Sequence, residues 1–414
     1  MRYYLFLLSY FFVSISFAQQ ALTIEQCEEL FLKNNLMLLA EQYNIDAAKA
    51  NIIQAKIWDL PYISGEFNLL NPQYNKVLDA GKQGEKTIAI QQLIYLGGKK
   101  KHEVDFAKSN LAIAELQYEQ LLRSLKLQLS QSFYELYFSQ KKVKSISFQI
   151  QNLDTLINEY NVQSIKGNIS LKDVVRLQSL SLSFKNQLID IQKNNIEQLE
   201  KLKLLISTQD DIDVIINEET ILQKLSNSLS VSKNELQDKT LEKNTEYLTS
   251  LKMIENADLM LRWQKSLAVN DLTLGANYDQ RGGAFNNQVN ITFGIPLPLW
   301  NKNKGNIQIA KAQVNQSLLM KDQKIQEVKS KVSSTYNLFI YQQNQYKSIT
   351  SNFKNFEIVY NGTFKNFQRR NISLLEFTDF MESYNESVLF LNEMTKQLII
   401  SGETLNYLTN QKIF

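Results

Sequence analysis

Hydrophobic residues recur at intervals of three and four along most of this chain, the spacing that places them on one face of an α-helix. The pattern is clearest in two stretches, one in each half of the sequence. The first contains Leu111, Ala114, Tyr118, Leu121, Leu125, Leu129, Phe133 and Leu136, and the second contains Ile325, Val328, Val332, Tyr336 and Phe339. Both stretches predict long amphipathic helices.

A different pattern, in which apolar and polar residues alternate, occurs near the four prolines. In VNITFGIPL, which begins at Val289, every second residue is apolar, and DLTLGANYD alternates in the same way. Alternation with period two predicts β-strands. We expect two hairpins, with strands at 63–69, 87–96, 272–279 and 289–297 and polar loops near 71–85 and 280–287.

Outside two short segments the chain has no proline, the residue that most strongly breaks a helix. We expect one helical run from 99 to about 166 and another from 302 to about 369, each roughly 100 Å long. A return helix of about 40 residues follows each run and ends near Ser207 or near Asn410. The sequence therefore predicts two long helical hairpins.

The tetrapeptide Asn-Ile-Ser-Leu occurs twice, at 168–171 and at 371–374, which is a separation of 203 residues. The same offset relates Lys99 to Lys302, and other identical pairs keep this register. The chain is therefore predicted to contain two copies of one unit, and the tetrapeptide marks the turn of the helical hairpin in each copy.

The N-terminus has the features of a secretory signal. Arg2 precedes an apolar run from Leu5 to Val13, and the small residues near Ala18 suit cleavage after that position. The run is shorter than the roughly 20 residues of a membrane-spanning helix, so an uncleaved anchor is the weaker alternative. No later stretch is apolar for long enough to span a bilayer as a helix, so insertion of this chain would require strands.

The composition provides little material for catalysis or metal binding. His102 is the only histidine and Cys27 the only cysteine, which argues against a metal centre, a cofactor site and a Ser-His or Cys-His catalytic pair. We expect Cys27 to be a small apolar residue on a helix face. The net charge of +3 is spread along mixed helices, so no nucleic-acid surface is indicated.

The predicted strands match the pattern of outer-membrane barrels, whose strands of about ten residues alternate between lipid-facing and lumen-facing side chains. Four strands cannot close a barrel, because barrels begin at about 8 strands and open edges do not face lipid. Several chains would therefore contribute to one barrel. A soluble two-hairpin sheet beside a coiled coil is the alternative.

Three segments resemble the TolC family of outer-membrane efflux channels. LTIEQCEELFLKNNLMLLAEQYNIDAAKANIIQAK, from Leu22, resembles the opening helix of that family, and YNVQSIKGNISLKDVVRLQ, from Tyr160, is similar to its periplasmic tip. FGIPLPLWNKNKGNIQIAKAQV, from Phe293, resembles the strand-to-helix junction, closest to the branch serving heavy-metal exporters of the resistance-nodulation-division type. The resemblance covers essentially the whole mature chain. Ala268 and Arg370 depart from it, where the family has proline and the tip glycine.

The resemblance implies a mostly α-helical chain with a transmembrane β part. Each protomer of a homotrimer would give four strands to a twelve-stranded barrel in the outer membrane of a Gram-negative bacterium, and its long antiparallel helices would form an α-barrel across the periplasm. The implied segments are a signal peptide at 1–18, a first repeat at 19–207, a mixed equatorial segment at 208–245 and a second repeat at 246–414.

The family function that this implies is a passive conduit without catalysis or cofactor. Its partners would be outer-membrane lipid, a periplasmic adaptor and an inner-membrane pump of the resistance-nodulation-division or ABC type. A protein-secretion conduit with the same architecture is one alternative, and an exported coiled-coil scaffold or adhesin without a pore is another.

The turn regions contain the candidate functional residues. Ser170 with Asp173 and Ser373 with Glu376 both fit a capping box, a purely structural explanation. The resemblance instead places Glu376 and Asp379 at the periplasmic aperture of the second copy, where a trimer would form rings that favour cations. The counterpart of Asp379 in the first copy is Arg176.

Two further sets of residues are candidates for contact with partners. Adaptor docking is expected at the exposed turns, through Gly167, Asn168, Ile169 and Ser170 and through Asn371, Ile372 and Ser373. Aromatic residues near the strand ends are candidates for the membrane interface, where such side chains form girdles. These residues are Tyr62, Tyr95, Tyr278 and Trp300.

Overall fold

A computed structural model describes residues 20–226, 229, 231–282, 284–300, 302–351, 353 and 355–414. The predicted signal peptide lies outside these residues. The chain divides into two compact units. One, here called the tip unit, comprises the described residues up to Met37 together with Arg123–Glu235 and Val332–Phe414, and the other, the sheet unit, comprises Leu38–Leu122 and Leu236–Lys331.

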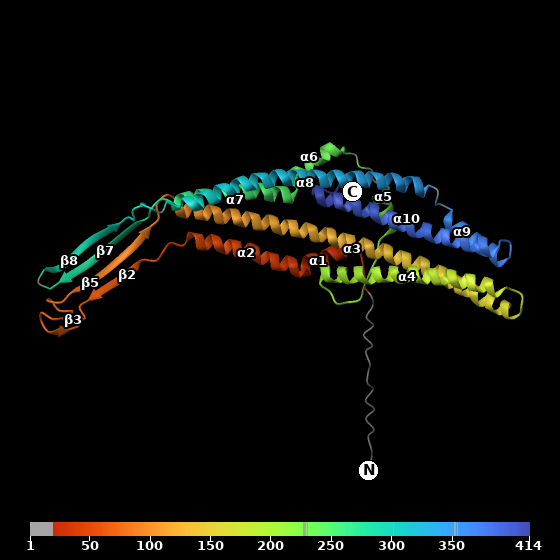
Figure 1. Ribbon diagram of the computed structural model, residues 1–414, viewed down its shortest axis with the longest axis horizontal. Coiled ribbons are helices and arrows are strands. Elements are labelled where there is room, and N and C mark those ends of the chain that lie inside the picture. Colours follow the sequence, from red (N-terminus) through yellow and green to blue (C-terminus); the bar gives the residue numbers. More distant parts are fainter. Residues whose placement is uncertain are drawn as a thin grey trace, which may run out of the picture. The chain divides into compact units, whose positions relative to one another are not determined.

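The sheet unit contains a four-stranded antiparallel sheet built from two hairpins (Figure 1). Its strands are β2 (Tyr62–Phe67), β5 (Lys86–Ile94), β7 (Leu272–Arg281) and β8 (Phe285–Gly294), in the order β2-β5-β7-β8. The pairing of β5 with β7 joins the hairpin from the first half of the chain to the hairpin from the second half. Both predicted hairpins are confirmed.

Apolar side chains lie on one face of this sheet and polar ones on the other, because side chains alternate along a strand. One cross-strand row consists of Ile63, Ile90, Ala276 and Ile291, and the adjacent row, on the opposite face, consists of Ser64, Ala89, Asn277 and Asn290. Ile291 is 84% exposed and Phe293 80% exposed. The apolar face is therefore largely uncovered in a single chain.

Three details of the strands differ from the prediction, and one is that the last strand, expected to reach 297, ends at Gly294, before Pro296. The first strand ends at Phe67 and is six residues long, because the chain turns into a small subsidiary hairpin in which Asn71 donates to Asp79 (3.1 Å). That hairpin consists of β3 (Leu70–Asn71) and β4 (Lys76–Val77). The second loop spans only 282–284, rather than 280–287, because the polar residues on both sides of it continue the strand ladder.

Long helices complete the sheet unit. They are α2 (Leu36–Lys56), the first part of α3 (Lys99–Ile165), most of α6 (Lys233–Lys243), α7 (Thr245–Leu267) and most of α8 (Lys304–Thr350). Lys99 at the start of α3 forms a largely buried ion pair with Asp271, just before β7 (2.7 Å). No helix in the described part of the chain is both long and apolar enough to span a membrane.

The tip unit contains the ends of two helical hairpins. In the first hairpin α4 (Leu171–Ile206) returns after α3, and in the second α10 (Leu374–Thr409) returns after α9 (Phe356–Gln368). The two return helices are both 36 residues long and start directly after equivalent serines. Both end at a left-handed residue, Ser207 or Asn410, each with φ 54°. The predicted return helices are therefore confirmed.

The second helical run, expected to be continuous from 302 to 369, is interrupted, so this prediction was wrong. α8 ends at Thr350 and α9 begins at Phe356. No proline causes the break, but Ser351 Oγ donates to the carbonyl oxygen of Ser348 (2.8 Å) where α8 ends, a local bond of the kind that competes with the helix. Phe353 and Phe356 stack there with ring centroids 3.9 Å apart, so aromatic packing also favours the break.

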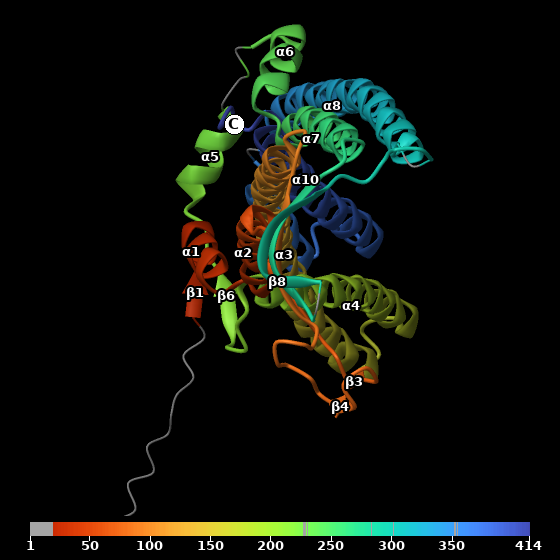
Figure 2. The same ribbon diagram turned by 90° about the vertical axis from the view of Figure 1, so that its left-hand side faces the viewer.

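The first part of the mixed segment between the two copies, up to Glu235, belongs to the tip unit, where its strand pairs with the N-terminal part of the chain. β6 (Ile212–Val214) pairs in parallel with β1 (Gln20–Leu22), and the two lie side by side in Figure 2. α1 (Ile24–Asn34) follows β1 and α5 (Glu218–Ser226) follows β6. Cys27 is fully buried on α1, as predicted, and burial, with a smaller effect of Glu25, raises its pKa to about 12.

Candidate functional site at the hairpin tips

Both hairpins turn through the same backbone motif. After α3, the N–H of Gly167 donates to the carbonyl oxygen of Ser164 at 2.9 Å. The N–H of Asn168 donates to the carbonyl oxygen of Gln163, also at 2.9 Å. Residues 366–371 repeat both bonds after α9 at the same distances. This pair of bonds is the Schellman motif, which satisfies carbonyl groups at a helix C-terminus.

The motif requires a left-handed residue, and the two turns supply it differently. Gly167 has φ 76° and Arg370 has φ 61°. Arg370 therefore adopts the same left-handed conformation as Gly167, although this conformation costs a residue with a Cβ about 1 kcal/mol. The asparagine side chains also correspond, because Asn168 Nδ2 donates to Gln163 (2.8 Å) and Asn371 Nδ2 donates to Asn366 (3.4 Å).

The two predicted capping boxes have different outcomes. Ser373 and Glu376 form the complete box: Ser373 Oγ accepts from the N–H of Glu376 (3.2 Å), and Glu376 Oε2 accepts from the N–H of Ser373 (2.8 Å). The backbone N–H and the hydroxyl of Ser373 both donate to the Glu376 carboxylate and lower its pKa. Ser170 caps α4 by accepting from the N–H of Lys172 (3.2 Å), one residue before Asp173, so the predicted box is not formed there.

Aromatic side chains hold the two tips against each other. Tyr160 of α3 stacks on Phe367 of α9 at 5.7 Å, and Phe367 stacks on Phe377 of α10 at 4.0 Å with an angle of only 8° between the rings. Both phenylalanines belong to a buried cluster that all four helices of the two hairpins share. Fully burying such a side chain contributes about 1.5–3 kcal/mol, so the tips form one packed body.

The predicted aperture and docking residues lie at the surface of this body. Arg176, Glu376 and Asp379 are exposed, and Asp173 is half-buried. Most of the turn residues proposed for docking are exposed as well. These are Gly167, Asn168, Ser170, Asn371 and Ser373, whereas Ile169 and Ile372 are half-buried. In a single chain, a partner molecule could therefore reach each of these positions at least in part.

A network of ion pairs connects α3 to α10. The spacing of apolar residues in the sequence did not predict these ion pairs. Glu393 bridges Lys142 (2.6 Å) and Lys396 (2.8 Å), and Lys396 also reaches Glu135 (2.8 Å). Lys396 is only 8% exposed. Burial would raise the pKa of Glu393, but hydrogen bonds from the two lysines outweigh burial and lower it to about 2.

A layer of amides continues this polar contact along the same helices. Gln149 donates to Asn385 (3.3 Å), and Asn385 donates to Gln187 of α4 (2.7 Å). Gln149 and Asn385 are each 1% exposed, and Gln149 Oε1 is buried without a partner among the described residues. The heptad spacing of Glu135, Lys142 and Gln149 was the sequence signal for this polar contact.

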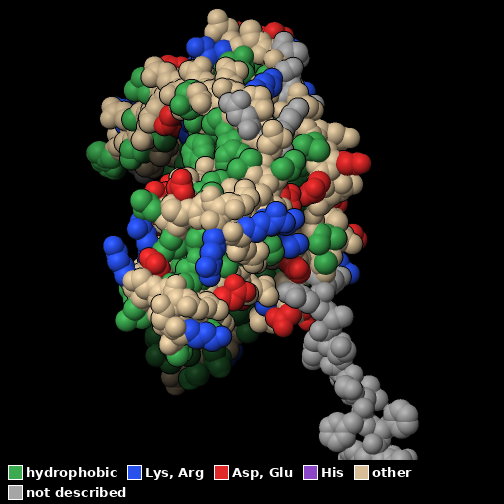
Figure 3. Space-filling model, turned by 90° about the vertical axis from the view of Figure 1, so that its right-hand side faces the viewer, with side chains coloured by type: hydrophobic (Ala, Val, Ile, Leu, Met, Phe, Trp, Pro, Cys, Tyr) green, Lys and Arg blue, Asp and Glu red, His purple; other side chains and the backbone are tan. Residues whose placement is uncertain are grey.

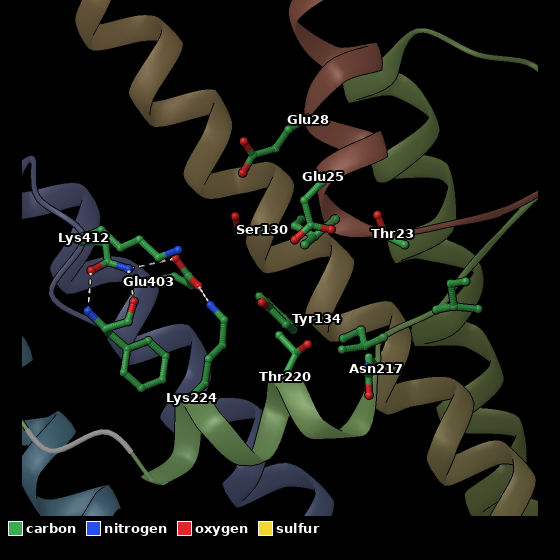
Figure 4. A pocket seen from close by; sticks show the side chains of 15 residues that line it. Thr23, Glu25, Glu28, Ser130, Tyr134, Asn217, Thr220, Lys224, Glu403 and Lys412 are labelled. Carbon is green, nitrogen blue, oxygen red and sulfur yellow. Dashed lines mark hydrogen bonds and ion pairs between the residues drawn. The ribbon is translucent and has the colours of Figure 1, made fainter.

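A cavity of about 460 Å³ lies elsewhere in the tip unit, where α1, α3, α5 and the end of α10 meet (Figure 4). Lys224 projects into it, pairs with Glu403, and lies 5.6 Å from the ring of Tyr134 and 5.4 Å from that of Phe414. Lys224 is thus already held by a carboxylate and two aromatic rings, which explains it as a structural residue that fixes the C-terminal tail.

The four aromatic candidates for the membrane interface all lie in the sheet unit but differ in position. Tyr62 starts β2 and is paired with Gln91 on the polar face. Tyr95 follows β5 and contacts Trp58 (5.5 Å), while Trp300 follows β8 and is 92% exposed. Tyr278 is on the apolar side, paired with Val289 nearer the β7–β8 turn.

Solved structures resemble this chain over nearly its whole length. CusC matches with 15% identity and a TM-score of 0.75, covering 93% of this chain and 91% of its own. The outer membrane channel CmeC of Campylobacter jejuni matches with 13% identity and a TM-score of 0.75, covering 94% and 86%. MtrE of Neisseria gonorrhoeae, in its open state, matches with 11% identity and a TM-score of 0.69, covering 94% and 89%.

At these identities the structures show that the fold is that of the TolC-like outer membrane channels, mostly helical with a small sheet. No curated protein matches the sequence significantly. The sequence itself matches the outer membrane efflux protein family over residues 29–208 and 256–411, which is most of the chain. The chain therefore belongs to the outer membrane efflux protein family.

Proposed function

We propose that this protein is the outer-membrane channel of a tripartite efflux system, a passive conduit without catalysis or cofactor. The observation that carries the proposal is the sheet, which has an uncovered apolar face and a polar face. Among the described strands, β2 and β8 each have a neighbour on one side only. Such a sheet is suited to lipid only after its edges are paired in a closed barrel.

Closure requires other copies of the chain, because four strands are fewer than the roughly 8 of the smallest barrels. A homotrimer would pair β8 of one copy with β2 of the next and give twelve strands. In this arrangement segments 19–207 and 246–414 would be two repeats, and 208–245 would lie in the belt around the helical barrel. The aromatic residues near the strand ends, Tyr95, Tyr278 and Trp300 above all, would then lie near the lipid headgroups.

The helical hairpins would reach into the periplasm, where their turns would meet an adaptor that links the channel to an inner-membrane pump. The resemblance of the junction FGIPLPLW from Phe293 favours a pump of the heavy-metal resistance-nodulation-division branch. The exported solutes would be small, with metal cations or drugs as the classes to test.

Reconstitution tests the channel itself. The mature protein should run as a detergent-resistant trimer from the outer-membrane fraction and should produce ion conductance in planar bilayers. A soluble periplasmic monomer without conductance would refute the proposal, and export of a large protein substrate by the intact system would replace it with a secretion conduit.

At the aperture we assign Glu376 and Asp379 to rings of carboxylates in the trimer, with Asp173 and Arg176 in the corresponding positions of the first copy. Asp379 is the sharper test, because Glu376 is used in a capping box and Asp379 is not. Asp379→Ala should weaken cation preference or raise leak conductance. Unchanged single-channel currents and selectivity would remove Asp379 from the aperture.

A further inference from the structure

Charged side chains of both signs are interspersed on the face of the molecule that Figure 3 shows, so this surface does not favour a partner of one charge. The cavity of about 460 Å³ in the tip unit differs, because several of its polar lining groups have no partner (Figure 4). Its volume lies in the range of small-molecule pockets, roughly 300–1,000 Å³. Among the described residues, none that is assigned above to the sheet faces, the aperture or the docking turns lines this cavity.

Two of the charged side chains that line the cavity are unpaired, one of each sign. Glu28 is paired with a lysine of α3 (3.1 Å), and Lys224 is paired with Glu403. Glu25 and Lys412 form no ion pair within the part of the chain that the structure describes. Glu25 belongs to α1 and Lys412 to the segment after α10, so the free carboxylate and the free ammonium come from different elements of the cavity wall.

A buried hydroxyl group of α3 also lines the cavity. Ser130 is only 9% exposed, and its side chain forms no hydrogen bond to any described residue. Buried polar groups normally have a hydrogen-bond partner, so this hydroxyl is free to bond to a molecule in the cavity. Other parts of the wall are apolar, among them Ile24, Ile215 and the ring of Phe414. The cavity therefore combines two opposite charges, a neutral hydrogen-bonding group and apolar surface.

Both segments that carry the free charges are held in place by hydrogen bonds. Asn406 Oδ1 accepts from the N–H of Ile413 (2.8 Å) and from the N–H of Phe414 (3.0 Å). Asn406 Nδ2 donates to the carbonyl oxygen of Phe414 (3.1 Å), so the chain on the C-terminal side of Lys412 is fixed. The capping box at the start of α1 fixes the turn that contains Glu25. Groups that are already ordered lose little entropy when a ligand binds.

We propose that this cavity binds a small zwitterion of the amino-acid or short-peptide class, with the ligand ammonium at Glu25 and the ligand carboxylate at Lys412. The hydroxyl of Ser130 bonds to the polar part of the ligand, and an apolar side chain of the ligand lies against Ile215 and the ring of Phe414. A ligand with a single charge would leave one of the two protein charges unpaired, so the cavity favours a zwitterion over a simple amine or a simple carboxylate.

Calorimetric titration of the full-length protein in detergent tests the ligand class with four related probes. Phenylalanine and glycylphenylalanine carry both charges, N-acetylphenylalanine lacks the ammonium, and phenylalaninamide lacks the carboxylate. At least one of the two zwitterions should bind with a Kd of roughly 1 mM or tighter, and the one that binds identifies a free amino acid or a peptide as the ligand. Both singly charged probes should bind about three- to fivefold more weakly, the upper part of the range for exposed ion pairs. Binding of neither zwitterion, or equal binding of all four probes, would overturn the proposal.

Two conservative variants connect each ligand charge to its residue. Glu25→Gln should weaken binding of the zwitterion about three- to fivefold and leave N-acetylphenylalanine unaffected, because that probe has no ammonium. Lys412→Gln should weaken the zwitterion by a similar factor and leave phenylalaninamide unaffected. The matched controls Glu29→Gln and Lys33→Gln replace exposed charges of α1 that do not line the cavity, and they should keep the original affinity. Unchanged affinity for the zwitterion in both cavity variants would place the ligand elsewhere and refute the proposal.

Bilayer conductance distinguishes this inference from the proposed function, on which it does not depend. All four variants should retain conductance, because the replaced residues belong neither to the sheet nor to the assigned aperture. Absence of conductance from the unmodified protein would refute the channel and leave the cavity in place. Normal conductance without binding of either zwitterion would refute only the zwitterion site.

Discussion

Arg370→Gly should stabilise the second tip, although it removes a side chain. The structure gives Arg370 a φ of 61°, a left-handed conformation that costs a residue with a Cβ about 1 kcal/mol relative to glycine. Because 1.36 kcal/mol corresponds to a tenfold change in an equilibrium constant, about 1 kcal/mol lowers the local opening constant of this turn roughly fivefold.

Amide hydrogen exchange measures that opening directly. The reporter is the N–H of Asn371, which donates to the carbonyl oxygen of Asn366 at 2.9 Å. In Arg370→Gly its exchange should slow about fivefold, whereas Arg370→Ala, which removes the guanidinium but keeps the Cβ, should give no such protection.

The first turn provides the reverse experiment in the same molecule. A Cβ added at Gly167 would meet no other atom within 4 Å, so Gly167→Ala tests the backbone conformation without a steric clash. It should accelerate exchange of the Asn168 N–H about fivefold and leave Asn371 unchanged. Equal protection of Asn371 in Arg370→Gly and Arg370→Ala would refute the reasoning, because the guanidinium and not the backbone would then govern the turn.

Three other predictions concern different parts of the chain. The folded-state pKa of Glu393 lies at about 2, below its ordinary value of 4.5, so its contribution to stability is complete above about pH 4.5 and declines as the pH falls towards 2. The thermal midpoint of the trimer should follow this decline, and Glu393→Gln should flatten it. Replacing either Gln149 or Asn385 by Leu should lower the free energy of unfolding by about 1–3 kcal/mol, because each single variant leaves a buried amide unpaired. In chemical denaturation the double variant should lose less than the sum of the two single losses. On the sheet, Ile291→Lys should reduce insertion into the outer membrane, whereas Thr292→Lys, on the polar face, should insert normally and shift ion selectivity. Equal insertion of the two lysine variants would contradict the assignment of the faces.

Much of the fold could be predicted because its signals are local. The return helices after Ser170 and Ser373, the capping box of Glu376 and the alternation in β7 and β8 depend on bonds and spacings within a few residues. The break between α8 and α9 was missed because proline was the only helix breaker considered. Here the bond from Ser351 to the carbonyl oxygen of Ser348 and the stacking of Phe353 on Phe356 accompany the end of the helix without it.

The 203-residue repeat was readable from sequence alone, because identical residues keep their register whatever the fold. The repeat already pairs Arg370 with Gly167, but only the structure shows that both have the same left-handed backbone conformation. From sequence one expects arginine to avoid φ 61°, and not that the hydrogen bonds of the turn enforce it.

The contacts between the two hairpins were decided only by the tertiary structure. Gln149 meets Asn385 and Glu135 meets Lys396 across more than 230 positions of sequence. Periodicity specifies which face of each helix is buried, but not which helix packs against it or in which register. That choice depends on the packing of complete side chains and on the cost of leaving a buried polar group unpaired, and neither exists until the helices have met.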